Sequence, residues 1–554
     1  MSPSDANANI ARHLALMAAS RPDQPALKVP RGRTGAGGID YLCLTFAELA
    51  AEAEAWRALL AARGVRRGDR TLVMVRPGLP LIAAVFALFQ LGAVPVIIDP
   101  GMGLRSFLGC VARSRPRVLV GIPFARFISH LFRRPFASLE VRVPASGSLV
   151  ARLARAPSPP GNSAPAMVSS QASDLAAILF TSGSTGSPKG VCYEHGMFEA
   201  QVRLVRDTYG IAPGEVDLPL LPIFALFNPA LGMTTIVPEI DPRRPAAMDP
   251  ARIVQAIRQE GVTNSFGSPT LWRKIFDHCL AHDLKLPELR RVLCAGASVP
   301  TSLYLDSLKV LSDGGLHSPY GATEALPVSS THTLEVLARD VLSESVRFGT
   351  CVGRTVAGME VRIIQISDEP IPDIAGAVEL PQGEIGEIIV RGPVVTKAYD
   401  GLPEATQAAK IRDGATVWHR MGDCGRIDGA GRLWFCGRKA ERVVTPTGTL
   451  FTDPCEQVFR ATFAGLRVAL IGLGPPGQMT PAVVVEDSPI AKDRKLFLGI
   501  MARTAQSQPH TAGISRFYIH PRFPVDTRHN AKIHRLKLAR WAATAKAFVA
   551  RPRT

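Results

Sequence analysis

Ten consecutive residues have the composition of a loop that binds phosphate. Residues 181–190, TSGSTGSPKG, follow directly on the apolar run at 175–180. Glycines allow backbone N–H groups to converge on an anion, the Ser and Thr hydroxyls add donors, and Lys189 adds a positive charge. The Walker A pattern does not fit, because Pro188 precedes the lysine and Gly190 follows it. We therefore predict a phosphate loop of another type at the end of a buried strand.

A second glycine pattern, VALIGLGPPG at residues 468–477, matches the G-x-G-x-x-G motif of dinucleotide-binding proteins. Asp493 follows roughly where a ribose-binding acid would fall. However, Pro475 and Pro476 remove two backbone N–H donors at the point where a pyrophosphate would need them. We predict a tight turn after a strand here, and dinucleotide binding is the alternative.

Four further motifs follow the phosphate loop in a fixed order. They are YGATE at 320–324, MGD at 421–423, GR at 437–438 and NAKI at 530–533. Together with the loop they resemble the core motifs of the adenylate-forming superfamily, which includes acyl-CoA ligases, carrier-protein adenylation domains and luciferases. The resemblance covers nearly the whole chain. It implies that ATP and Mg²⁺ are the cofactors and that a carboxylate attacks the α-phosphate of ATP, giving acyl-AMP and pyrophosphate.

The resemblance implies a role for each matching residue in the reaction. Lys189 and the loop would hold the β- and γ-phosphates, Glu324 would hold Mg²⁺, and Thr323 would reach the α-phosphate. Lys532 would bridge the carboxylate and the α-phosphate during adenylation. The implied catalytic residues are Thr181, Lys189, Glu324 and Lys532.

The remaining motif residues would bind the nucleoside. Asp423 would accept the ribose hydroxyls with Arg438 beside it, while residues 295–297 and Tyr320 would enclose the adenine. The implied nucleotide-binding set is Thr181, Ser182, Gly183, Ser184, Thr185, Gly186, Lys189, Gly296, Ala297, Tyr320, Gly321, Thr323, Glu324, Asp423 and Arg438.

The chain departs from the general pattern of the superfamily at three places. Met421 replaces the usual Thr of T-G-D, and Val443 and Val444 stand where many relatives carry a lysine that serves the second half-reaction. These departures argue against a thiol as the second nucleophile. The segment at 221–230 also lacks a histidine often found there. The implied acyl pocket includes Phe224, Phe227 and Gly267.

Three stretches, at 218–242, 421–439 and 523–533, resemble the β-lactone synthetases of bacterial long-chain olefin biosynthesis and of related lipid pathways. In that group the β-hydroxyl of a 2-alkyl-3-hydroxyalkanoic acid attacks its own adenylate and expels AMP. The resemblance implies a long-chain β-hydroxy acid substrate and allows assembly with other enzymes of the same lipid pathway. A long-chain acyl-CoA ligase and an acyl-AMP ligase are the alternatives, and the sequence does not identify a base for the hydroxyl proton.

Apolar patterning predicts the elements that position these motifs. Thr45 and Glu48 form the capping box of a helix, and apolar runs at 71–75 and 94–98 flank a helical stretch at 81–91, which is a β-α-β pattern. The predicted fold class is therefore α/β. The resemblance adds a large N-terminal domain of layered α/β subdomains at 1–437, which would hold ATP and the acyl group, and a small mobile α+β domain at 438–554, which would carry Lys532.

Composition limits the setting and the partners of the 554-residue chain. Its nine cysteines are odd in number and never spaced C-x-x-C, which favours a reducing, cytoplasmic setting, and we identify no export signal. The net charge of +17 is spread along the sequence, so we predict a solvated surface and no nucleic-acid partner. The apolar stretch at 79–98 contains Pro80, Gln90, Gly92 and Pro95, which favours a buried helix and strand over a membrane span.

Residues 122–136 interleave aromatic side chains with Arg126, Arg133 and Arg134. This composition is compatible with a helix that lies at a membrane surface, although helix packing against the sheet is the expected arrangement. Peripheral membrane contact is therefore an alternative for this segment.

Overall fold

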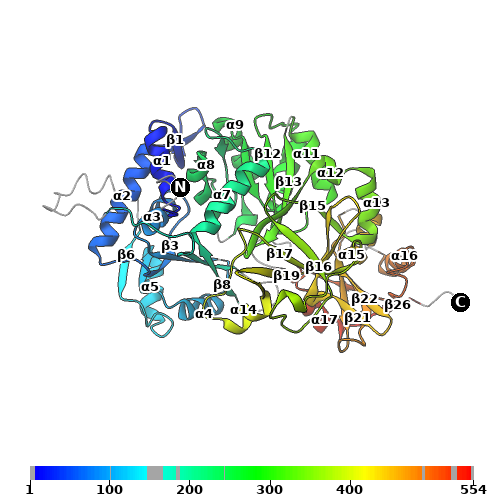
Figure 1. Cartoon of the computed structure of the whole chain (residues 1–554). Helices are drawn as coiled ribbons and strands as arrows, with labels where there is room; N and C mark the ends of the chain where they lie inside the picture. The colour runs from blue at the N-terminus through cyan, green and yellow to red at the C-terminus, as the bar shows by residue number, and fades with distance from the viewer. Residues whose placement is uncertain are drawn as a thin grey trace.

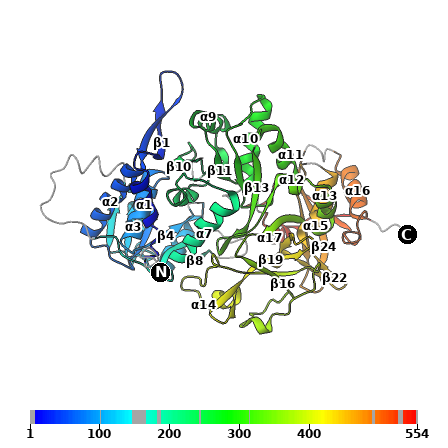
Figure 2. The same ribbon diagram turned by 45° about the horizontal axis from the view of Figure 1, so that its top comes forward.

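The computed structural model describes residues 7–99, 101–145, 166–181, 188–241, 244–312, 314–463, 465–488, 493–525 and 533–550. These residues form two large sheets, a smaller C-terminal sheet and helices packed around them (Figure 1). Several C-terminal elements, among them α15, α16 and β22, lie at the same end of the molecule as α13 in both ribbon views (Figure 2).

The first sheet has the strand order β6-β5-β3-β4-β7-β8. Its strands are β3 (Arg70–Met74), β4 (Val94–Ile98), β5 (Val118–Gly121), β6 (Val141–Pro144), β7 (Leu175–Thr181) and β8 (Lys189–Glu194). The first five run parallel, and β8 is antiparallel to β7. Helix α3 (Leu79–Gln90) connects β3 to β4, followed by α4 (Leu104–Ser114) and α5 (Pro123–Leu131). The predicted β-α-β unit is confirmed.

Both faces of this sheet are covered, as a parallel sheet requires. Val73 and Val120 belong to the core cluster that includes α3, whereas Leu72 and Val96 belong to a second cluster with Phe107 of α4. The stretch at 79–98 is thus a buried helix and strand, as predicted. Among the described residues, no helix combines the length and the apolar character needed to cross a membrane.

The N-terminal helices are α1 (Arg12–Ser20) and α2 (Phe46–Ala62). The Thr45 hydroxyl accepts from the Glu48 backbone N–H at 3.2 Å, and the Glu48 carboxylate accepts from the Thr45 N–H at 2.8 Å. The capping box predicted from the sequence is therefore present.

The second sheet has fourteen strands and joins parallel and antiparallel parts. Its strands are β1 (Pro25–Arg33), β2 (Ile39–Thr45), β9 (Val216–Asp217), β10 (Thr234–Ile236), β11 (Asn264–Gly267), β12 (Arg291–Cys294), β13 (Gly315–Ala322), β14 (Ala325–His332), β15 (Thr350–Thr355), β16 (Glu360–Ile364), β17 (Gly386–Arg391), β18 (Lys410–Asp413), β19 (Thr416–Ile427) and β20 (Leu433–Arg438). Strands β9 to β13 pair in parallel, and the pairs from β13 to β20 are antiparallel.

Helices cover this sheet and connect its strands. They are α7 (His195–Tyr209), α8 (Asn228–Leu231), α9 (Pro250–Glu260), α10 (Pro269–Ala281), α11 (Thr301–Val310), α12 (Thr333–Val336), α13 (Arg339–Phe348) and α14 (Pro403–Ala409). Trp272 and Phe276 of α10 are fully buried in the core cluster that also holds Val292 of β12 and Leu316 of β13. Helix α10 therefore packs against β12 and β13. Because these strands are parallel, their carboxyl ends lie at the same edge of the sheet.

The C-terminal part begins where β20 ends, at Arg438. It contains a hairpin, β21 (Val443–Thr445) and β22 (Gly448–Leu450), and a four-stranded sheet, β23 (Val468–Leu473), β24 (Thr480–Glu486), β25 (Arg516–His520) and β26 (Phe548–Val549), with helices α15 (Thr452–Thr462), α16 (Arg494–Ala505) and α17 (Arg535–Ala542). The sheet has a separate core cluster on each face.

The glycine pattern at 468–477 forms a turn between two antiparallel strands. Gly474 and Gly477 have φ values of 102° and 85°, and the chain continues from β23 directly into β24. A dinucleotide-binding motif needs a helix after the glycines, because the helix N-terminus holds the pyrophosphate. The predicted turn is confirmed, and the dinucleotide alternative is wrong.

Candidate active site

The phosphate-loop segment connects the last two strands of the first sheet. Thr181, the last residue of β7, is paired with Lys189, the first residue of β8. The side chain of Thr181 and the loop residues Ser182, Gly183, Ser184, Thr185 and Gly186 lie outside the described residues. The prediction of a strand that leads into this loop is confirmed, whereas the contacts of the loop itself stay a prediction.

Glu324 lies at the turn between β13 and β14, close to the end of the phosphate loop. Its Oε1 accepts a hydrogen bond from the Tyr399 hydroxyl at 2.6 Å, and the Lys189 Nζ lies 4.7 Å from the centre of the same tyrosine ring. The backbone carbonyl of Glu324 accepts from the Thr396 N–H at 2.9 Å. Burial and the Glu324 carboxylate raise the pKa of Tyr399, so the phenol keeps the proton that it donates.

This arrangement fits a magnesium ion bound together with a triphosphate. Mg²⁺ in such sites takes one or two carboxylates and completes its coordination with phosphate and water oxygens. The Glu324 Oε2 accepts no hydrogen bond from the described residues, and Lys189 supplies a neighbouring positive charge. One oxygen of the carboxylate is therefore fixed and the other is available.

Asp423 is a buried carboxylate that is held from two sides. It stands on β19 opposite Arg438 of β20, with 2.7 Å between Oδ1 and the Arg438 Nη1. Its Oδ2 accepts from the Tyr320 hydroxyl at 2.7 Å. The Asp423 charge raises the pKa of Arg438, so the ion pair stays charged. An ionised carboxylate only accepts hydrogen bonds, which is the chemistry that the hydroxyl groups of a ribose require.

A second buried carboxylate, Glu387 of β17, organises the segment that carries Asp423. Glu387 is fully buried, and its two oxygens accept from the Arg420 Nε at 2.9 Å and Nη2 at 2.7 Å. Lys439 adds contacts of 3.1 and 3.2 Å to the same carboxylate. Because Arg420 lies three residues before Asp423 and Lys439 directly follows Arg438, this cluster fixes both sides of the Asp423–Arg438 pair.

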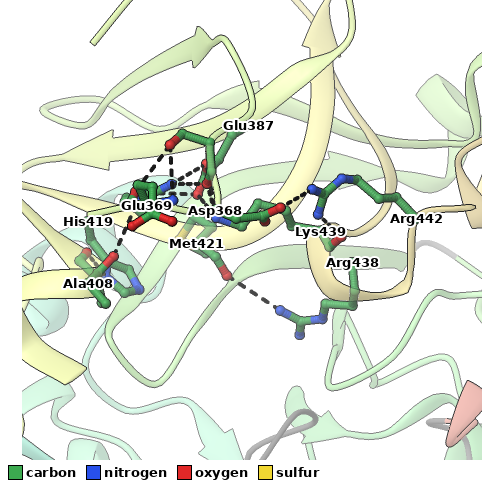
Figure 3. Close-up of polar contacts among 12 residues, drawn as sticks. Asp368, Glu369, Glu387, Ala408, His419, Met421, Arg438, Lys439 and Arg442 are labelled. Carbon is green, nitrogen blue, oxygen red and sulfur yellow. Dashed lines mark hydrogen bonds and ion pairs between the residues drawn. The ribbon is translucent and has the colours of Figure 1, made fainter. Parts of the chain in front are cut away.

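Figure 3 shows how the loop around Asp368 is tied to the same cluster. The Lys439 Nζ donates to the Ser367 carbonyl at 2.8 Å, and the Arg420 Nη1 donates to the Glu369 carbonyl at 2.8 Å. Arg442 reaches Asp368 from the far side. The Arg438 guanidinium points away from this group toward the Met421 carbonyl, at 3.5 Å (Figure 3).

The predicted adenine residues gather at the carboxyl ends of parallel strands. Gly296 and Ala297 follow β12, and Tyr320 and Gly321 are near the end of β13. Gly296 has a φ of 97°, and a Cβ on Gly321 would clash with the Ala325 carbonyl oxygen, so both positions require glycine. In open α/β sheets ligands bind outside this end of the strands, which agrees with the predicted nucleotide site.

Aromatic side chains surround the predicted acyl pocket. Phe224 stacks on Phe266 with 3.7 Å between ring centres, and Phe227 lies 6.2 Å from Phe198. A Cβ on Gly267 would come within 2.8 Å of the side chains of Leu220 and Trp272, so a larger residue would displace this wall. The sequence predicted Phe224, Phe227 and Gly267 but not Phe266, Phe198 or the adjacent Tyr193, since an aromatic residue alone does not reveal its partners.

His195 is a buried histidine shortly after the phosphate loop, and Lys532 is a predicted catalytic residue. His195 is buried at the start of α7, where its Nδ1 accepts from the Ile10 N–H at 3.2 Å. Burial lowers the pKa of His195 to about 4, so the imidazole packs in its neutral form. Lys532 lies outside the described residues, so its role stays a prediction.

The comparisons with known proteins place the chain in a family. Residues 15–400 match the family of AMP-binding enzymes, and the chain belongs to it. It is 45% identical to the olefin β-lactone synthetase of Stenotrophomonas maltophilia, with 97% of this chain and 98% of the relative covered. It is 44% identical to the olefin β-lactone synthetase of Xanthomonas campestris pv. campestris, with 97% of each covered.

A solved structure of similar fold is ATP-bound MatB from Rhodopseudomonas palustris. The TM-score is 0.76 at 22% sequence identity, and 97% of this chain and 99% of the other are covered. These findings confirm the predicted α/β adenylate-forming fold and an ATP-dependent enzyme that acts on a carboxylic acid. ATP with Mg²⁺ is the cofactor pair of this family, as predicted.

The Glu387 cluster gives a stability prediction. Glu387→Gln removes the negative charge between the buried Arg420 and the partly buried Lys439, so we expect the free energy of unfolding to fall by about 3–5 kcal/mol in urea denaturation. Glu369→Gln is the matched control, because Glu369 is exposed and contributes only its backbone carbonyl. Equal unfolding midpoints for Glu387→Gln and the wild type would contradict the role of this carboxylate.

Proposed function

We propose that the chain is an ATP- and Mg²⁺-dependent β-lactone synthetase. It converts a 2-alkyl-3-hydroxyalkanoic acid with long chains into a β-lactone and releases AMP and pyrophosphate. The observation that carries this proposal is the similarity, over nearly the full length of both chains, to two proteins named olefin β-lactone synthetase. A feruloyl-CoA synthase from Amycolatopsis is 32% identical over 80% of this chain, which makes a CoA ligase the second candidate.

The first step is adenylation of the carboxylate. Lys189 and the loop residues from Thr181 to Gly186 hold the β- and γ-phosphates, Thr323 reaches the α-phosphate, and Glu324 holds the metal. Mg²⁺ at Glu324 neutralises the phosphates and so supports departure of pyrophosphate. A carboxylate oxygen then bonds to the α-phosphorus, and the bond to the pyrophosphate oxygen breaks.

The nucleoside half of ATP lies on the other motifs. Asp423, fixed by Arg438 and Tyr320, accepts the ribose hydroxyls, and adenine lies between residues 295–297 and Tyr320. The support for this placement is the buried Asp423 carboxylate, which is held by Arg438 and by Tyr320 near the end of β13. Residues 1–437 form the domain that binds ATP and the acyl group, and residues 438–554 form a mobile domain that brings Lys532 to the α-phosphate.

The second step closes a four-membered ring within the substrate. The β-hydroxyl oxygen attacks the adenylate carbonyl carbon, the hydroxyl proton leaves, and the carbonyl–phosphate bond breaks to release AMP. A pocket that holds the acyl chains folded offsets the entropy of this attack. Val443 supports a second step without a thiol, because it is fully buried in the core of the C-terminal sheet and offers no charge to a thiolate.

The setting and partners follow from the same features. All nine cysteines are free thiols, which supports a reducing, cytoplasmic compartment. A thiolase-like condensing enzyme and a short-chain reductase are the kinds of neighbouring enzyme that would supply the 3-hydroxy acid, and assembly with enzymes of the same lipid pathway belongs to this proposal.

The lactone product is the direct test of this function. With ATP, Mg²⁺ and a 2-alkyl-3-hydroxy acid but no CoA, we expect AMP and a product lighter than the acid by one water, measured by mass spectrometry. The matched substrate is the 3-deoxy acid, which has the same carboxylate and chains but no internal nucleophile. It is expected to stop at acyl-AMP and to turn over poorly, with or without CoA. Rapid acyl-CoA formation from the 3-deoxy acid would instead establish the CoA ligase.

We further propose that α5 contacts a membrane that carries anionic lipids. Phe124, Phe127 and Leu131 are each more than 60% exposed and recur at a spacing that places them on one helix face. Ala125 and Ile128 on the other face are buried, which agrees with the predicted packing against the sheet. Exposed Arg133 follows the helix, and the net charge of +17 favours an anionic surface.

Vesicle flotation tests the membrane contact. At low salt, wild type is expected to float with vesicles of phosphatidylglycerol and phosphatidylcholine and to sediment with phosphatidylcholine alone. Phe124→Ser/Phe127→Ser is expected to lose most of this binding, whereas Leu334→Ser, which alters another exposed apolar residue, is not. Equal flotation of wild type and the double variant would refute the contact.

A further inference from the structure

Lys410, the first residue of β18, is a buried cation that forms no ion pair with a carboxylate of the described residues. It is 6% exposed, and its Nζ donates to the backbone carbonyl and the hydroxyl of Thr396. No carboxylate oxygen of the described residues lies within 4 Å of this nitrogen. Buried Arg420 is paired with Glu387, and the partly buried Arg438 and Arg535 are paired with Asp423 and Glu456. Buried Arg426 instead lies 3.6 Å from the centre of the Phe348 ring. Lys410 therefore lacks the compensation that these cations have.

The position of Lys410 relates it to the triphosphate end of the site. Its Nζ lies 6.0 Å from the centre of the Tyr399 ring, which also lies 4.7 Å from the Lys189 Nζ. The Tyr399 hydroxyl holds Glu324, and Thr396, the partner of Lys410, donates its N–H to the Glu324 carbonyl. A single intervening residue, Tyr399, therefore lies between Lys410 and Lys189, and Tyr399 and Thr396 connect Lys410 to Glu324.

The surroundings of Lys410 also lack negative charge on their open side. Lys410 borders a cavity of about 670 Å³ together with Tyr399, Lys397 and Arg412, and no Asp or Glu lines it. Burial lowers the pKa of Lys410 to about 7, with Glu324 opposing this effect and Lys189 adding to it. An uncompensated buried charge costs free energy in the empty protein. A protein can keep a destabilising buried charge of this kind when the charge serves to bind a ligand of opposite charge.

We propose that Lys410 is a positioning residue that balances the charge of the ATP triphosphate through Tyr399 and Glu324. The proposal rests on the adenylation reaction proposed above. The loop and Lys189 contact the phosphates directly. Lys410 adds a positive charge on the other side of the Tyr399 ring. Its contribution appears when the β- and γ-phosphates are present, because these carry the charge that the empty site lacks.

Two uncharged variants of the full chain test this proposal. Lys410→Met keeps the length of the side chain, and Lys410→Gln keeps a donor for Thr396. With Mg²⁺ and no acyl substrate, we expect calorimetry to show binding of ATP weakened about tenfold or more and binding of AMP changed less than twofold. Without ligand, thermal unfolding of Lys410→Met is expected at or above the wild-type temperature, since a buried charge has been removed.

Lys397→Met is the matched control. Lys397 borders the same cavity, but its side chain is half exposed and it is paired with Glu194 at 2.8 Å, so it is expected to bind ATP like the wild type. Equal weakening of ATP and AMP, or unchanged ATP binding, in both Lys410 variants would overturn the proposal. Wild type that does not bind ATP would instead refute the proposed function and leave the Lys410 comparison without its reference.

Discussion

The buried charge of Glu387 is the constraint on which the nucleotide side of the site depends. A fully buried carboxylate is tolerated only with good compensation, and here Arg420 and Lys439 supply it. Arg420 is on β19, the strand that carries Asp423, and Lys439 directly follows Arg438 in the sequence. The contacts of Arg420 and Lys439 with Glu387 therefore hold β17, β19 and the end of β20 in one relative position. The ribose-binding geometry proposed for Asp423 follows from that packing.

The two carboxylates proposed to contact the ligand are also held by neutral or cationic donors. Asp423 is held by Arg438 and Tyr320, and Glu324 by Tyr399. In each case the tyrosine keeps its proton because burial and the neighbouring carboxylate raise its pKa. The carboxylates are thus oriented before a ligand binds, which reduces the reorganisation needed during reaction.

Local sequence patterns predicted the features that depend on neighbouring residues. The capping box of α2, the β-α-β unit around α3, the strand before the phosphate loop and the turn at 474–477 all follow from patterns within short continuous stretches of the sequence. The motifs predicted site residues in the segments that form β13, β19 and β20, and the contact of these residues with a ligand stays a prediction. Tyr399, Lys410, Glu387 and Phe266 were missed, because their roles arise from contacts between segments that are far apart in the sequence. A single tyrosine or lysine in a sequence does not indicate which distant residue its side chain will contact.

The claim that joins the fold, the site and the family is that the enzyme activates a carboxylic acid as its adenylate. Exchange of labelled pyrophosphate into ATP measures this step alone, because reversal of adenylation does not need the β-hydroxyl. We expect exchange that depends on the acid, is supported by the 3-hydroxy acid and its 3-deoxy analogue alike, and is lost in Asp423→Asn. Exchange that is absent with both acids, although ATP binds, would contradict the account.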